Sequence, residues 1–205
     1  MIKLFKTENE KRAERVVKNI EKMRQNSQEM RMWTNIPLAK ESMELLQAID
    51  DDEAASGMAM ACDAIVQQLP EYDVPRLVLD LLHLELTLMQ RAGGKLPDCF
   101  SAEENVRNDI CRLQDYIDIA HVSYSEFMER HHRHLNFDSI ERTPEWEENY
   151  YEIEKECDHR LGNEPRGMGF CFSYWSTLRQ VLAEHGIEWH SPSELNPRVM
   201  FDSVA

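Results

Sequence analysis

The chain has 205 residues, of which 42% are hydrophobic and 30% are charged, and its formal net charge is −15. This composition is ordinary for a globular protein, and the negative charge argues against direct nucleic-acid binding by the acidic body. No stretch approaches the roughly 20 apolar residues that span a bilayer. The first residues contain no continuous apolar segment of the kind found in a secretory signal. The five cysteines form no Cys-x-x-Cys pair. We therefore expect one cytoplasmic helical domain over residues 1–205, without a membrane span or a cofactor.

The N-terminal segment differs in charge from the rest of the chain. Its first 40 residues hold ten Lys or Arg and five Asp or Glu. Thr7 and Glu10 have capping-box spacing, and apolar residues then recur at helical spacing over about 8–31. Residues 1–36 are therefore expected to contain a basic amphipathic helix at the periphery, which either complements the acidic body or serves an interaction.

Several further helices are marked by residues typical of helix starts. Pro37 and Pro75 suit first helical positions, and an acidic run precedes residue 54. The helix predicted over 75–92 is apolar on most sides and should be central. Thr143-Pro144 and Gly169 precede two later helices, and no alternating pattern indicates strands. We predict an all-α fold of about seven helices in a bundle-like or orthogonal array, with residues 187–205 docking on the body as a tail.

The longest helix is predicted over about 102–135, after a capping-box pattern at residues 101–104. Its apolar residues alternate in steps of four and three, which is the period of bundles and coiled coils. The residues of this seam are Val106, Ile110, Leu113, Ile117, Ala120, Tyr124 and Phe127.

Two Glu-x-x-His pairs have the spacing of di-metal carboxylate sites in helical bundles. They are Glu129 with His132 and Glu156 with His159. The seam of the longest helix places the first pair on the solvent side, and the second pair lies at the margin of its helix. A metal site at these four residues is therefore not favoured.

Continued past Phe127 in steps of four and three, the seam instead includes His131 and His134. These two residues would lie one turn apart at the end of the same helix. Two such histidines could bind a metal or titrate together near neutral pH. The alternative is an ordinary helix end, where positive side chains suit the negative end of the helix dipole.

A third candidate lies in the central helix, where Asp80 precedes His83 by one turn. A carboxylate can orient an imidazole as a general base or a metal ligand. The alternative is a solvated polar edge on an otherwise buried helix.

Arg166, Gly167 and Gly169 precede another helix and could bind a small anion through free backbone amides. No nucleotide-binding loop is indicated, because a helix precedes this turn and no Gly-Lys-Ser/Thr sequence ends it.

No catalytic motif is recognisable in the chain. We expect an acidic protein-interaction module, a binding or inhibitory protein that recognises another protein or itself through charge and a helical surface. The alternative is a metal- or small-molecule-dependent enzyme with a His, Asp and Glu pocket in the helical bundle. An enzyme would gather these polar residues in one cleft, whereas an interaction module would leave them dispersed.

Overall fold

A computed structural model describes residues 6–93, 103–162 and 164–201. It is 70% helical and has no strand among these residues, which confirms the predicted all-α fold. The chain divides into two compact units, Met1–Gln114 and Asp115–Ala205. The single domain expected from the sequence stays a prediction.

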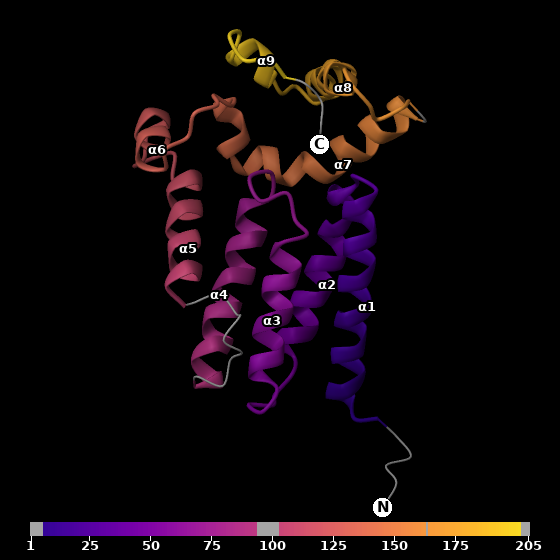
Figure 1. Cartoon of the computed structure of the whole chain (residues 1–205), viewed down its shortest axis with the longest axis vertical. Helices are drawn as coiled ribbons and strands as arrows, with labels where there is room; N and C mark the ends of the chain where they lie inside the picture. Colours follow the sequence, from indigo (N-terminus) through magenta and orange to yellow (C-terminus); the bar gives the residue numbers. More distant parts are fainter. Residues whose placement is uncertain (1–5, 94–102, 163, 202–205) are drawn as a thin grey trace, which may run out of the picture. The chain divides into compact units, whose positions relative to one another are not determined.

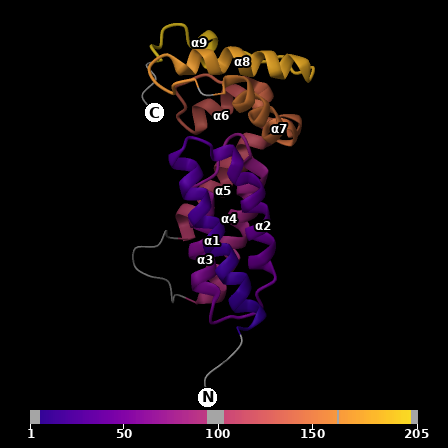
Figure 2. The ribbon, with the colours of Figure 1, turned by 90° about the vertical axis from the view of Figure 1, so that its right-hand side faces the viewer.

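The N-terminal unit is an array of helices that run side by side (Figures 1 and 2). α1 packs mainly on α2, and α3 packs mainly on α4. The helices are α1 (Glu8–Gln28), α2 (Asn35–Gln47), α3 (Ala55–Val66), α4 (Pro75–Ala92) and α5 (Glu103–Ile117), with the short 3-10 helix η1 (Met32–Thr34) between α1 and α2. The end of α5, from Asp115 onward, belongs to the C-terminal unit.

The predicted helix starts agree with the structure in this unit. Thr7 caps α1, because its hydroxyl accepts from the amide of Glu10 at 3.2 Å while the Glu10 carboxylate accepts from the Thr7 amide at 2.6 Å. Pro75 is the first residue of α4, and Gly93 ends that helix in the left-handed conformation. Ten of the 18 residues of α4 are buried, so its predicted central position is confirmed. The second helix begins at Asn35, two residues before the predicted Pro37.

The single long helix predicted over 102–135 is wrong. α5 ends at Ile117, and α6 (Tyr124–Arg130) begins after a turn. Ser123 restarts the helix with its own capping box to Glu126. The pattern predicted at residues 101–104 falls partly outside the described residues. Val106, Ile110, Leu113 and Phe127 are buried as the seam predicts, but Ala120 is exposed.

The C-terminal unit contains α6, the 3-10 helix η2 (Ser139–Arg142), α7 (Pro144–Leu161), α8 (Phe170–Glu184) and α9 (Pro192–Leu195). α7 packs on α8 (Figure 2). As predicted, Thr143 caps α7 and Gly169 precedes α8. Rings of Tyr116, Phe127 and Phe137 contact one another in this unit.

Residues 187–201 lie against the segment before α7. The Asn136 amide donates to the side-chain oxygen of Asn196 at 2.8 Å, and the Asn196 side chain donates to the Asn136 carbonyl at 2.8 Å. Trp189 donates to Glu141 at 2.7 Å. These bonds hold the described part of the tail, while residues 202–205 lie outside the described residues. Among the helices that the structure describes, none has both the length and the apolar character needed to cross a membrane.

Candidate functional site

The residues singled out by the sequence are spread over both units. Asp80 and His83 are exposed on α4, and no hydrogen bond joins them in the described structure. Their surroundings are those of the solvated edge that was the alternative interpretation. The eleven residues that the sequence suggested as catalytic, metal-binding or anion-binding are absent from the lining of the pockets in the described structure.

The interpretation of His131 and His134 as neighbours on one helix face is wrong. α6 ends at Arg130, so His134 lies beyond the helix and is exposed. His131 is half-buried, and its Nε2 lies 2.9 Å from a carboxylate oxygen of Asp115, which also accepts from Arg130 at 2.8 Å. Burial acts to raise the pKa of Asp115, but hydrogen bonds from Arg130 and His131 lower it overall.

Neither Glu-x-x-His pair lies within a cluster of potential metal ligands in the described part of the chain. Glu129 and His132 are both exposed, and His132 has a positive φ of 50° just beyond α6. On α7, Glu156 accepts from Arg160 at 2.8 Å and His159 is exposed. Within the described ranges, no group of three or more His, Cys, Asp or Glu side chains is arranged to hold a metal ion.

The predicted anion site has a carboxylate where an anion would bind. Arg166 donates to Asp158 at 2.7 Å, and its guanidinium lies 5.5 Å from the centre of the Phe170 ring. Gly169 caps α8 with a φ of 86°, so it serves the backbone turn into this helix. Gly167 is exposed in the same loop. The arrangement indicates a structural turn in which the Arg166 charge is already neutralised.

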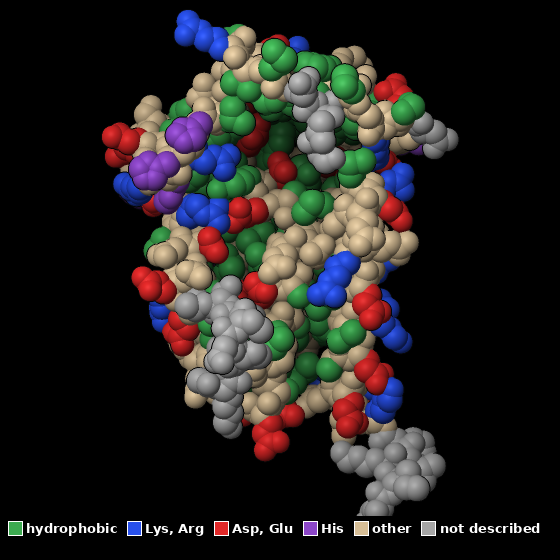
Figure 3. All heavy atoms as spheres, viewed as in Figure 1, with side chains coloured by type: hydrophobic (Ala, Val, Ile, Leu, Met, Phe, Trp, Pro, Cys, Tyr) green, Lys and Arg blue, Asp and Glu red, His purple; other side chains and the backbone are tan. Residues whose placement is uncertain are grey.

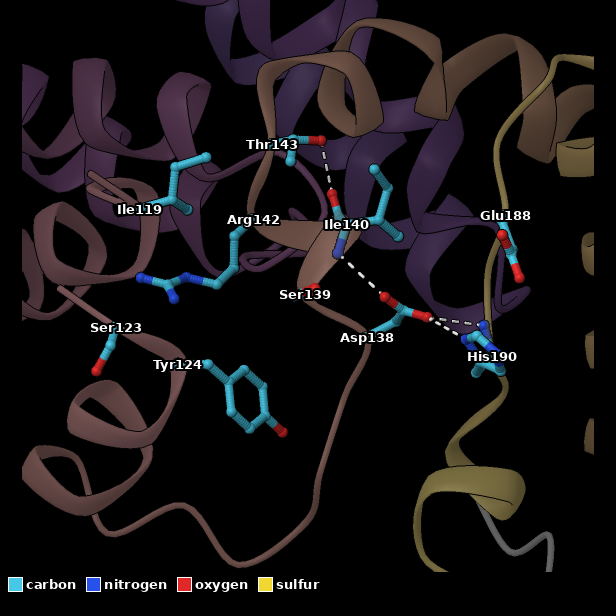
Figure 4. A pocket seen from close by; sticks show the side chains of 10 residues that line it. All are labelled: Ile119, Ser123, Tyr124, Asp138, Ser139, Ile140, Arg142, Thr143, Glu188 and His190. Atoms are coloured by element: carbon cyan, nitrogen blue, oxygen red, sulfur yellow. Dashed lines mark hydrogen bonds and ion pairs between the residues drawn. The ribbon is translucent and has the colours of Figure 1, made fainter. Parts of the chain in front are cut away.

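A pocket of about 610 Å³ lies in the C-terminal unit around η2 (Figure 4). Asp138 and His190 stand on one side of it, and the Arg142 side chain extends toward the opposite side. Asp138 accepts from the Ile140 amide at 3.1 Å, from the His190 amide at 2.9 Å and from His190 Nδ1 at 2.9 Å. The ring of Tyr124 forms part of the wall.

The Asp138–His190 pair has the geometry of an oriented base. The hydrogen bond to Asp138 raises the pKa of His190, and the carboxylates of Glu188 and Glu194 act in the same direction. Asp138 fixes Nδ1, so Nε2 is the nitrogen left to meet a ligand. This pair was not predicted from the sequence, because 52 residues separate its members. The spacing of Asp138 and Glu141 resembles a helix start and was the available signal.

A second hollow, of about 660 Å³, lies in the N-terminal unit between α1 and α3. Its floor is formed by the buried side chains of Val16, Leu46, Ile49 and Met58. In Figure 3, hydrophobic atoms follow the space between α1 and α3, and acidic side chains lie at its lower end. We call this feature the α1–α3 groove. Its lining residues are Thr7, Asn9, Glu10, Ala13, Val16, Val17, Leu46, Ile49, Asp51, Glu53, Ala54, Gly57, Met58 and Ala61.

The groove is open because small residues occupy its walls. Ala13 on α1, Ala54 just before α3, and Gly57 and Ala61 on α3 carry no bulky side chain, and a Cβ atom added at Gly57 would meet nothing within 4 Å. Val17 on the α1 wall remains 54% exposed. The recurrence of small residues at 54, 57 and 61 was visible in the sequence, but it was not interpreted as a helix surface.

A buried carboxylic acid lies elsewhere in the N-terminal unit. Glu85 on α4 is only 1% exposed, and its Oε1 atom has no hydrogen-bond partner. Burial raises its pKa to about 8, with smaller contributions from the charges of Asp63 and Asp109. The neighbouring Cys62 thiol is also buried, which raises its pKa. The helix pattern predicted a central, mostly apolar helix over 75–92, but no buried carboxylic acid was predicted in it.

Comparison with known proteins adds no family to these observations. No family model, curated protein or solved structure matches the chain. The function is therefore inferred from the two hollows, the charges around them and the dispersion of the predicted polar residues.

Proposed function

We propose that this chain is an acidic protein-interaction module that binds an apolar segment of a partner protein in the α1–α3 groove. The observation that carries the proposal is the groove itself, an open apolar surface whose charged lining residues, Glu10, Asp51 and Glu53, are all acidic. Exposed apolar surfaces bordered by polar residues are typical of binding sites for proteins and ligands.

Two further observations support this proposal over catalysis at the predicted residues. Asp80 and His83 lie in the N-terminal unit, while His131, Glu156 and the other candidates lie in the C-terminal unit. The described pockets have none of these residues in their walls. We expected an interaction module to leave these polar residues dispersed, and an enzyme to gather them in one cleft.

A photo-crosslinking amino acid placed at position 17 tests the proposal in cells that naturally make the protein. Val17 lines the groove and is exposed, so we expect a discrete crosslinked product containing a second protein. The matched control is the same amino acid at Glu44, an exposed position on α2 outside the groove lining. No product at position 17, or the same product at both positions, would count against the proposal.

The Asp138–His190 pair favours a second candidate function, the binding or conversion of a small molecule in the pocket of Figure 4. An imidazole oriented by a carboxylate is suited to general-base chemistry. A small-molecule library can be screened by following the ring resonances of His190 in NMR spectra. This candidate requires a compound that shifts those resonances together with the ring resonances of Tyr124, which lines the same pocket, and that no longer shifts the Tyr124 resonances in His190→Gln.

A further inference from the structure

The α1–α3 groove also has a shape and charge that fit one class of partner. We infer that its occupant is a basic amphipathic helix, an inference that rests on the function proposed above. Three properties of the groove carry it: the small residues of its walls, the absence of a backbone edge and the sign of its charges.

The walls allow another helix to come close. Ala13 on α1 and Gly57 and Ala61 on α3 line the groove from its two walls, with Ala54 just before α3, and small residues let helix backbones approach each other. The lining of α1 runs from Thr7 to Val17, ten residues further along the helix. That run is about 15 Å long at 1.5 Å per residue, enough to contact between two and three turns of a partner helix.

An extended peptide would find less to bind in the same place. Extended segments are usually recognised by pairing with the unpaired backbone groups of a sheet edge. The two long walls of the groove are α1 and α3, with the end of α2 and the loop before α3 completing the lining, and the backbone groups inside a helix already bond to one another. A helical partner satisfies its own backbone, so it loses no hydrogen bonds when its apolar face enters the groove.

The charges select a basic partner. Glu10, Asp51 and Glu53 line the groove, and no Lys, Arg or His is among its lining residues in the described ranges. Among the described residues, neither Asp51 nor Glu53 forms an ion pair with a Lys or Arg, so both charges are available to a partner. Complementary charges at the edge of an interface speed association and select partners. Lys or Arg beside the apolar stripe of the partner helix would meet these carboxylates.

Synthetic helical peptides of about 18 residues, roughly five turns, provide the test. One combines Leu with Lys, a second Leu with Gln and a third Leu with Glu, and a fourth is the Leu/Lys peptide with a central Pro. Binding to the full chain is measured by fluorescence anisotropy at low and high salt. We expect the Leu/Lys peptide to bind about tenfold or more tightly than the other three, with an affinity that falls as salt rises.

Variants separate groove binding from general attraction to an acidic protein. Gly57→Trp and Ala13→Trp fill the groove from opposite walls without changing the net charge, so each should weaken Leu/Lys binding about tenfold or more. Met60→Trp is the matched control and should bind normally, because Met60 is exposed on α3 outside the groove lining. Asp51→Asn combined with Glu53→Gln should weaken binding and its salt dependence, while Glu44→Gln should not. Circular dichroism identifies any variant that fails to fold, and the opposite wall then supplies the blocking variant.

The outcomes distinguish this inference from the proposed function. The basic-helix inference is overturned if both tryptophan variants bind the Leu/Lys peptide as tightly as the native chain does. It is also overturned if the native chain binds the Leu/Glu peptide as tightly as the Leu/Lys peptide. If position 17 crosslinks to a partner but no Leu/Lys binding is found, the interaction function stands and the inference fails. Sedimentation showing a dimer of the full chain that Gly57→Trp dissociates would replace the basic helix with a second copy of this chain.

Discussion

Arg142 donates a hydrogen bond from its Nε to the carbonyl oxygen of Tyr116 at 2.6 Å. Its Nη2 also donates to the carbonyls of Asp115 at 3.0 Å and Val122 at 2.8 Å. Arg142 is only 2% exposed. One guanidinium therefore satisfies carbonyls at the end of α5 and in the following turn, which stabilises the break between α5 and α6.

Replacing Arg142 with Met should destabilise the C-terminal unit by roughly 2–5 kcal/mol, because several carbonyls would lose their donor in a buried setting. Arg142→Lys should recover only part of this loss, since an ammonium lacks the planar fork that spans the carbonyls. Thermal unfolding followed by near-ultraviolet circular dichroism measures the effect. Melting of the methionine variant at the wild-type temperature would contradict the role assigned to Arg142.

The break in the long helix shows what the sequence could and could not predict. The apolar seam correctly predicted burial of Leu113 and Phe127, because helical periodicity reports which face is buried. The same seam predicted that Ile117 is buried, but Ile117 is only half-buried. The adjacent Tyr116, which is not part of the seam, is 1% exposed. Periodicity could not predict the donor that ends the helix, because Arg142 lies 26 residues further along the chain than Tyr116.

The helix starts were easier to predict than the site. Thr7, Thr143 and Ser191 each cap the helix that follows within a few residues, so local sequence contains the signal. The α1–α3 groove combines residues of three helices and the loop before α3. Its existence depends on how these elements pack, and single-chain spacing does not contain that information.

The pair formed by Asp138 and His190 should be visible in a pH titration. The hydrogen bond from His190 to Asp138 raises the pKa of His190 above its usual 6.5. Stabilisation by this pair is therefore fully present below pH 6.5 and is lost as the pH rises through the raised value. In NMR titrations, Asp138→Asn should lower the pKa of His190 while a side-chain oxygen remains to accept from the Ile140 amide. An unchanged pKa in that variant would show that Asp138 is not the cause.

Two glycines should respond in opposite ways to the same substitution. Gly57 lies in α3 with open space where a Cβ would stand, so Gly57→Ala should raise stability by up to about 1 kcal/mol. Gly186 follows α8 with a φ of 78°, a conformation that an alanine side chain disfavours, so Gly186→Ala should cost about 1–2 kcal/mol. Melting temperatures of the two variants check the contrast. A stabilising Gly186→Ala would mean that its left-handed turn is not required.

Glu85 should make the stability of the protein fall with rising pH. Burial raises its pKa from the usual 4.5 to about 8 in the folded chain. Between these values the unfolded chain has released the proton and the folded chain retains it, so folding takes up a proton. The contribution of Glu85 to stability is therefore greatest below pH 4.5, declines through the interval and levels off above about pH 8.

Glu85→Leu removes this dependence and the unpartnered Oε1 atom together. We expect the variant to gain several kcal/mol relative to the native chain between pH 5 and pH 9, since each pKa unit corresponds to about 1.4 kcal/mol. Urea unfolding at the two pH values measures the gain. Asp80→Asn changes an exposed carboxylate of the same helix and should shift stability by no more than about 0.5 kcal/mol at either pH. If Glu85→Leu and the native chain lost stability in parallel from pH 5 to pH 9, the buried carboxylic acid would not be the group that titrates.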